Sequence, residues 1–107
     1  MATPIHMLYL IKRKEAWYQL SDEERSTVGE QTLAATTEAG GERLILCDAT
    51  WSSGDCEFFE LTEFPDISAV QKRIELYEQV NLLRYFEIST ILGLEMGHQR
   101  HEAQQEG

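Results

Sequence analysis

Basic residues are scarce in this sequence. Nine lysines and arginines stand against nineteen aspartates and glutamates, which gives the 107-residue chain a formal net charge of −10. Proteins that bind nucleic acid need clustered bases to pair with phosphates, and the one basic run, Lys12-Arg13-Lys14, is followed at once by Glu15. We therefore expect no nucleic-acid partner, and the same acidity disfavours binding to an anionic membrane surface.

Long hydrophobic runs are also missing. No segment approaches the roughly 20 consecutive apolar residues of a membrane-spanning helix. The stretch from Met1 to Pro4 leads directly into a strand-like segment and lacks the apolar core of a signal peptide. We expect a cytoplasmic protein that has no membrane partner.

Cysteine is limited to Cys47 and Cys56, which lack the spacing of a metal site or a CxxC motif. If the chain turns at Ser52-Ser53-Gly54, Cys47 pairs well beyond Cys56, too far for the ~5.5 Å Cα separation of a disulfide. We expect two separate, reduced thiols, as is usual in a reducing compartment.

The residues that are present predict one domain. Hydrophobic residues make up 42% of the chain, and 107 residues leave no room for two domains. We assign residues 1–97 to this domain. The polar segment 98–107 reads as a disordered C-terminal tail.

Apolar periodicity predicts six elements. Strands are expected at 5–13, 42–51, 56–64 and 84–96, and helices at 22–39 and 67–80. Ser21 and Glu24 form a capping box at the first helix, and Gly40-Gly41 ends it. The order β-α-β-β-α-β predicts an α+β, ferredoxin-like domain, with a four-stranded antiparallel sheet and both helices on one face.

The other face of this sheet predicts a partner. If Phe86, Ile88 and their alternate neighbours pack under the helices, Tyr85, Glu87, Ser89 and Ile91 look the opposite way. We place three further sets on that opposite face: His6, Leu8 and Leu10; Leu44, Leu46, Asp48 and Thr50; and Phe58, Glu60, Thr62 and Phe64. Each set mixes apolar and polar side chains, and a half-polar face with large aromatic side chains should be covered. A homodimer packed sheet against sheet would cover it and enclose a small-molecule cavity.

Three segments carry a resemblance to known proteins: Ala16–Arg25 (AWYQLSDEER), Phe58–Asp66 (FFELTEFPD) and Tyr77–Asn81 (YEQVN). They resemble a family of small, mostly uncharacterised bacterial proteins of the dimeric α/β-barrel superfamily, over roughly Tyr9 to Gly93. The superfamily includes cofactor-independent monooxygenases acting on polycyclic aromatics, muconolactone isomerases, haem-degrading enzymes and proteins without shown activity. The resemblance implies the fold but carries over no catalytic motif.

Four titratable residues are the catalytic candidates: His6, Asp48, Glu60 and Glu87. Strand alternation can bring them to one cavity-facing side, where burial would raise the carboxyl pKa values and allow general acid–base chemistry. Alternatively, Asp48 and Glu87 lie in water at strand ends and His6 is an edge residue. A one-residue change of strand register reverses the facing of every side chain.

Seven residues are candidates for ligand binding: Tyr9, Trp51, Phe58, Thr62, Phe64, Asn81 and Tyr85. Aromatic side chains can line a pocket for an aromatic ligand, and they can equally fill a core or a dimer interface. Asn81, between the second helix and the last strand, either caps the helix end or contacts a ligand at the pocket mouth.

We expect no metal site and no tightly held cofactor. His98 and His101 have helical spacing but lie in the polar tail, where further ligands are not assured. Haem would have to use His6. The favoured function is a cofactor-independent monooxygenase or isomerase acting on an aromatic or carbonyl-bearing metabolite. The alternatives are a non-catalytic ligand-binding or pathway-accessory dimer, and a purely structural dimer.

Overall fold

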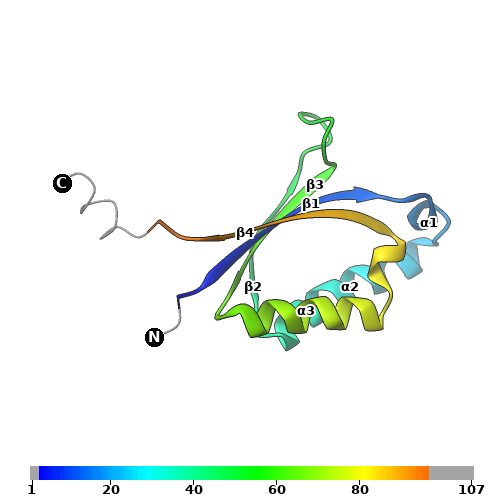
Figure 1. Cartoon of the computed structure of the whole chain (residues 1–107). Coiled ribbons are helices and arrows are strands. Elements are labelled where there is room, and N and C mark those ends of the chain that lie inside the picture. Colours follow the sequence, from blue (N-terminus) through cyan, green and yellow to red (C-terminus); the bar gives the residue numbers. More distant parts are fainter. Residues whose placement is uncertain (1–2, 97–107) are drawn as a thin grey trace.

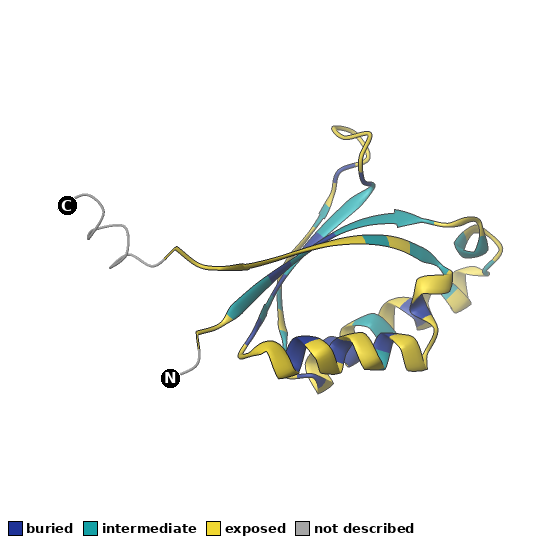
Figure 2. Ribbon diagram, in the orientation of Figure 1, coloured by how far each residue is buried: buried dark blue, intermediate teal, exposed yellow. Residues whose placement is uncertain are grey.

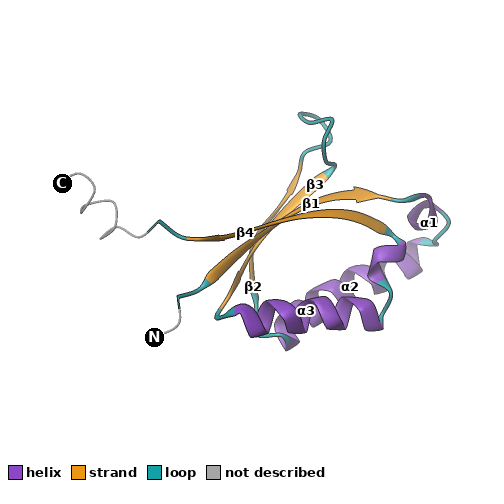
Figure 3. Cartoon of the chain, in the orientation of Figure 1, coloured by secondary structure: helices purple, strands orange, loops and turns teal. Residues whose placement is uncertain are grey.

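The computed structural model describes residues 3–96, which form one antiparallel sheet covered on one face by helices (Figures 1 and 3). The strands are β1 (Ile5–Arg13), β2 (Glu42–Asp48), β3 (Phe58–Phe64) and β4 (Phe86–Leu94), in the spatial order β2-β3-β1-β4. The helices are α1 (Glu15–Tyr18), α2 (Asp22–Glu38), α3 (Ile67–Gln79) and the 3-10 turn η1 (Leu82–Arg84). This order confirms the predicted α+β, ferredoxin-like fold.

The start of α2 follows the sequence prediction. The Ser21 hydroxyl accepts a hydrogen bond from the Glu24 backbone N–H at 3.1 Å, and the Glu24 carboxylate accepts one from the Ser21 N–H at 2.9 Å. This capping box satisfies two N–H groups that a helix start leaves free. The helix stops before Gly40, whose φ of 88° is a left-handed conformation that favours glycine.

The hairpin between β2 and β3 is longer than predicted, because β2 ends earlier and β3 begins later than expected. The Asp48 carboxylate accepts hydrogen bonds from the backbone N–H and the hydroxyl of Thr50, at 2.9 and 2.6 Å. Such a side-chain turn diverts the chain from the strand. Cys47 pairs with Phe59 in the sheet, whereas Cys56 precedes β3, and both thiols are free.

The buried stripe of α3 differs from the prediction. The helical spacing of Ile67, Val70, Ile74 and Tyr77 predicts one apolar stripe that faces the sheet, but Ile67 and Ile74 are 48% and 42% exposed. The residues that α3 buries are Ala69, Val70, Arg73 and Tyr77. The helix is therefore turned so that an arginine lies under the sheet.

The side of the sheet predicted for each alternating set of side chains is right for β4 and wrong for β3. Phe86 and Ile88 pack against the core under the helices, as expected. Phe64 and Thr62 are completely buried, and Glu60 hydrogen-bonds to α3, so this alternating set of β3 also faces the helices. Apolar and polar residues mix on both sides of β3, so its composition does not fix which side is covered.

In β2 an irregularity sets the facing. The register shifts between Arg43 and Ile45, which is the signature of a β-bulge. Arg43 and Leu46 both turn toward the helix side as a result, where they line a cavity. The prediction that Leu46 belongs to the opposite face is therefore wrong.

The opposite face, which we name the uncovered face, carries these side chains: His6, Leu8 and Leu10 of β1, Ile45 and Cys47 of β2, Phe59 and Leu61 of β3, and Glu87, Ser89 and Ile91 of β4. Ile91 is 56% exposed and Ile45 is 50% exposed. Figure 2 shows the exposed far half of β4, which reaches beyond the helices.

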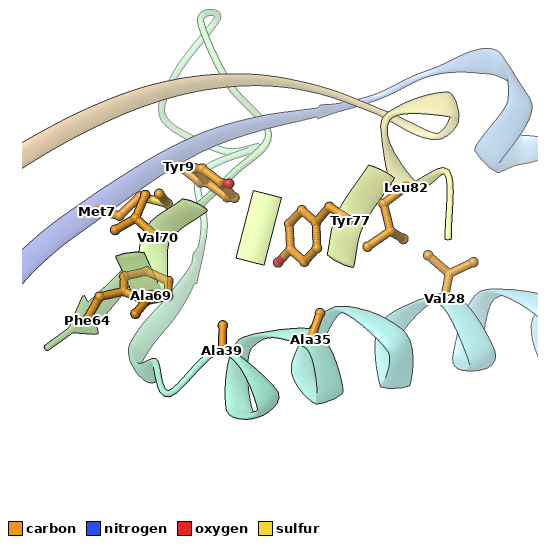
Figure 4. Packing of buried hydrophobic residues seen from close by; sticks show 10 residues of the cluster. All are labelled: Met7, Tyr9, Val28, Ala35, Ala39, Phe64, Ala69, Val70, Tyr77 and Leu82. Carbon is orange, nitrogen blue, oxygen red and sulfur yellow. The ribbon is translucent and has the colours of Figure 1, made fainter. Parts of the chain in front are cut away.

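The core lies between the sheet and the two long helices (Figure 4). Met7, Tyr9 and Phe64 come from the sheet, Ala69, Val70 and Tyr77 from α3, Leu82 from η1, and Val28, Ala35 and Ala39 from or just beyond α2. Apart from Val28, the α2 side therefore contributes only small alanines to this cluster.

No helix within residues 3–96 is long and apolar enough to cross a membrane. The predicted tail at 98–107, with His98 and His101, lies outside the described residues.

Candidate ligand-binding site

A half-enclosed cavity of about 250 Å³ lies between the sheet and the helices. Its lining comes from every strand and helix: Tyr9, Ile11, Arg13, Trp17, Gly29, Thr32, Arg43, Leu46, Phe58, Glu60, Tyr77, Leu82, Phe86 and Ile88. The sequence predicted a cavity on the uncovered face. In this chain the cavity lies on the opposite side of the sheet.

The cavity exists because α2 has small residues where a helix normally buries large ones. Gly29 and Thr32 line it, and the neighbouring buried positions are Val28, Ala35 and Thr36. Protein interiors are otherwise close-packed. Figure 4 shows Val28 and Ala35 pointing from α2 toward the sheet, with Tyr77 of α3 beside them. Short side chains on one wall leave room for a ligand.

A buried ion cluster forms part of the cavity wall. Arg73 of α3 is 0% exposed, and its Nη2 lies 2.5 Å from Glu60 Oε1 on β3. Arg43 of β2 donates from Nε to the other oxygen of Glu60 at 3.0 Å. The Thr62 hydroxyl adds a hydrogen bond to Glu60 Oε1 at 2.7 Å. Both carboxylate oxygens are thus fully engaged.

Aromatic rings help to hold Arg73 in the core. Its guanidinium carbon lies 4.7 Å from the ring centre of Tyr9 and 4.8 Å from that of Tyr77. Arg73 also donates to the Tyr77 hydroxyl, from Nε at 2.9 Å and from Nη2 at 2.5 Å. Cation–π contacts of this kind strengthen when water is excluded.

This environment sets the protonation states of the cavity wall. Burial raises the pKa of Glu60, but the charge and hydrogen bonds of Arg73, with the bond from Thr62 and the charge of Arg43, lower it by more, so the group stays ionised. Burial, offset in part by Arg73, raises the pKa of Tyr9 to about 12. Burial also raises the pKa of Tyr77. Both phenols therefore remain O–H donors at neutral pH.

Three of the predicted site residues line the cavity: Glu60, Tyr9 and Phe58. Thr62 and Phe64 are buried nearby without lining it, Thr62 as a partner of Glu60 and Phe64 as part of the core. The structure thus brings together one of the four catalytic candidates and two of the seven ligand-binding candidates.

The uncovered face holds two other catalytic candidates. His6 lies there between Glu63 of β3 and Gly93 of β4, and its Nδ1 is buried without a hydrogen-bond partner among the described residues. Glu87 is exposed and pairs in register with Lys12. Neither lines the cavity on the helix side.

The remaining candidates lie at the ends of elements. Asp48 is bound to Thr50, whose two hydrogen bonds lower the pKa of its carboxyl. Trp51 is 84% exposed in the hairpin loop. Asn81 is exposed, with a left-handed φ of 54° and no side-chain capping bond, and Tyr85 packs against the edge of the core. None of these residues lines the cavity.

The sequence prediction missed Arg43, Arg73 and Tyr77 as site residues. Helical spacing held a signal for Arg73, which stands three residues after Val70 and four before Tyr77 on one side of α3. A buried arginine needs a buried acid, and Glu60 on β3 was the available partner. Arg43 had no comparable signal, because the bulge that turns it inward has no mark in the sequence.

Comparisons with known proteins show the fold. No protein-family model matches the chain, and no curated protein matches it. A novel haem-binding protein from Thermus thermophilus superposes on the whole chain with a TM-score of 0.78 and 15% identity. Chlorite dismutase from Candidatus Nitrospira defluvii, in complex with imidazole, superposes on 88% of the chain with a TM-score of 0.72 and 20% identity.

This chain shares its ferredoxin-like fold with both proteins. It spans 46% of the haem-binding protein and 41% of the chlorite dismutase, so it is less than half as long as either. At such identities the likeness is one of backbone architecture. What the cavity binds must be argued from its own side chains.

Proposed function

We propose that this chain is a small-molecule-binding protein, with its ligand in the cavity between sheet and helices and with two copies paired through the uncovered face. One observation carries the proposal: the cavity of about 250 Å³ has a wall that is largely apolar and aromatic, with a satisfied buried ion cluster in it. Ligand sites typically combine an apolar wall with a few fixed polar groups.

Haem, which the Thermus thermophilus protein binds, does not fit this lining. Haem iron takes a histidine, cysteine, methionine or tyrosinate ligand, and the lining has no histidine, cysteine or methionine. The tyrosinate form of Tyr9 is disfavoured, because its pKa is about 12. His6 lies across the sheet from the cavity. We therefore propose a smaller organic ligand.

Catalysis is supported less well than binding. A cofactor-independent monooxygenase or an isomerase needs a base that can take a proton from its substrate. Glu60 is the one carboxylate among the cavity-lining residues, and it already accepts hydrogen bonds from Arg73, Arg43 and Thr62. Its lowered pKa makes it a weak base. These contacts favour the non-catalytic, ligand-binding alternative.

The homodimer part of the proposal rests on the uncovered face. Half-buried Leu8, Leu10 and Phe59 lie there with exposed Ile91 and Ile45. A continuous apolar patch on a sheet usually marks an interface. A second copy, packed sheet on sheet, presents the same patch about a two-fold axis and removes both patches from water.

A pair of matched variants tests the location of the ligand. Thr32 and Thr27 both lie on α2, and each hydroxyl donates to a carbonyl in the preceding turn, at 2.7 and 3.2 Å. Thr32 lines the cavity, whereas Thr27 is exposed and does not. We expect Thr32→Phe to fill the cavity and Thr27→Phe to leave it open.

The measurement is saturation-transfer NMR with 2-naphthoate and 2-naphthamide as probes. The wild type and Thr27→Phe should give transfer to the naphthalene ring, and Thr32→Phe should reduce it at least about tenfold, because ring and phenyl compete for one space. Absence of transfer from the wild type to both probes, or equal transfer in all three proteins, would overturn the proposed site.

A further inference from the structure

A cluster of three charged side chains at the cavity has an excess of positive charge, although the chain as a whole has a net charge of −10. Two arginines, Arg73 and Arg43, share the single carboxylate of Glu60. Arg13 also lines the cavity, but Glu57 neutralises it at 3.1 Å. The Asp48 carboxylate acts on the charge of Arg13 as well. The Arg73–Glu60–Arg43 cluster by itself carries two positive charges and one negative charge, and Arg43 borders the largely apolar cavity.

Arg43 holds the unpaired part of this charge. Its side chain is 25% exposed, and only Nε makes a hydrogen bond to the described residues, to Glu60. That bond fixes the guanidinium plane and leaves its two terminal nitrogens unused within residues 3–96. A guanidinium held in this way can bind a carboxylate through two parallel hydrogen bonds.

Of the two tyrosines at the cavity, Tyr9 offers a donor to a ligand. Tyr9 is 5% exposed and lines the cavity, and its hydroxyl makes no hydrogen bond to any residue between 3 and 96. The Tyr77 oxygen accepts twice from Arg73, and the side chain of Thr36 is a further hydrogen-bond partner, so this phenol is already engaged within the core. In Figure 4 the two side chains extend from opposite walls, Tyr9 from the sheet and Tyr77 from α3.

The cavity wall is therefore complementary to a ligand that accepts hydrogen bonds and carries negative charge. The oxygens of Glu60, the one carboxylate in the wall, are taken by Arg73, Arg43 and Thr62, so a donor group on the ligand would find little to bind there. A site that places hydrogen-bond donors against its ligand discriminates strongly in favour of a ligand that accepts from them.

The other side chains of the wall determine the size and the aromatic character of the ligand. Aromatic rings are frequent in it: Tyr9, Trp17, Phe58, Tyr77 and Phe86. Aromatic pairs gain energy beyond their buried area when they stack offset or edge to face. The volume of about 250 Å³ exceeds the roughly 150 Å³ cavity that binds one benzene. One ring or two fused rings fit this space.

We propose that the cavity selects a small aromatic molecule with one carboxylate, and that Arg43 is the residue that selects the carboxylate. This inference rests on the proposed function, because it takes the same cavity as the ligand site. The ligand carboxylate neutralises the surplus charge of the Arg73–Glu60–Arg43 cluster. The hydroxyl of Tyr9 is a further donor to it, and the aromatic wall holds its ring.

The test compares 2-naphthoate with its neutral isostere 2-naphthamide by calorimetric titration of the full chain. The wild type should bind the acid about tenfold tighter or more, which is the usual effect of one charged hydrogen bond. Arg43→Gln should reduce this preference to about twofold or less. Arg43→Lys keeps the charge but loses the two-pronged contact, and should give an intermediate preference.

The acid-to-amide ratio separates a selecting role from a structural one, because a damaged fold would weaken both probes together. Equal affinities for the two probes in the wild type, or an undiminished preference in Arg43→Gln, would overturn this inference and leave the ligand site in place. Failure of both probes to bind the wild type would instead overturn the proposed function.

Discussion

The two faces of the sheet bury different kinds of residue. On the covered face a completely buried arginine, Arg73, is paired with Glu60 and ringed by Tyr9 and Tyr77. On the uncovered face an apolar side chain such as Ile91 is 56% exposed. An ion pair is buried within an otherwise apolar core on one face, and apolar side chains are exposed on the other.

Each of these two features indicates a different role. Burying an ion pair costs desolvation energy that its own attraction barely returns, so the covered face is organised around a polar site rather than for stability alone. Exposed apolar area on the other face favours association. This difference is what we expect if ligand binding belongs to the covered face and subunit contact to the uncovered one, as we propose.

Removing one partner of the buried Arg73–Glu60 ion pair should have the largest effect on the covered face. Arg73→Met should lower the free energy of unfolding by about 3–5 kcal/mol, because it leaves Glu60 buried beside only the partly exposed Arg43. The double variant Arg73→Met/Glu60→Leu should recover much of this loss, since it removes both buried charges. Urea unfolding followed by circular dichroism measures both. A loss below about 1 kcal/mol in the single variant would contradict this account of the cluster.

A charge introduced on the uncovered face should weaken the homodimer. Ile91→Asp should weaken the homodimer by about 2 kcal/mol, or roughly 30-fold in Kd, because the carboxylate would be desolvated between two sheets. Ile74→Asp is the matched control, since Ile74 is 42% exposed on the helix side. Sedimentation velocity over a micromolar concentration series distinguishes them. A wild type that is monomeric throughout, or equal weakening by both variants, would exclude this face as the interface.

Acid should weaken the covered face through Glu60. Its folded pKa lies below the unfolded value of about 4.3, so the folded state binds fewer protons in the interval between them. The stabilisation is complete above that interval and is lost as the pH falls, by about 1.4 kcal/mol per pH unit within it. Urea unfolding between pH 3 and pH 6 should give a shallower pH dependence for Glu60→Gln. Parallel curves for the two proteins would show that Glu60 is not linked to folding.

Prediction from sequence succeeded where local signals decide the structure. The capping box at Ser21 and Glu24, the stop at Gly40 and the alternation of β4 are each set by neighbours in the chain. These signals were sufficient to predict the element order, and the crossover rules then left the ferredoxin-like topology.

The site was harder to predict, because it depends on contacts between distant residues. Glu60 was expected on the uncovered face, and only its pairing with Arg73 of α3 shows that it faces the helices. A strand of mixed polarity such as β3 gives no preference for either side. Arg43 faces inward through a bulge at the neighbouring residues. Both features become visible only when the helix and the strands are assembled.

The smallest predicted effect concerns two glycines near the covered face. A Cβ added at Gly29, in α2 at the cavity wall, would meet no atom within 4 Å, so Gly29→Ala should stabilise the protein by about 0.5–1 kcal/mol through helix propensity. A Cβ added at Gly41 would lie 2.5 Å from the ring of Phe64, which is completely buried and has no room to move. Gly41→Ala should therefore destabilise by about 1–3 kcal/mol.

If the space beside Gly29 is open and that beside Gly41 is filled, thermal unfolding should show a raised Tm for Gly29→Ala and a lowered Tm for Gly41→Ala. A destabilised Gly29→Ala would mean that α2 packs against the sheet at this position. The small residues of α2 would then fill the space that we assign to a ligand. The covered face would have no room for a ligand, and its proposed difference from the uncovered face would be lost.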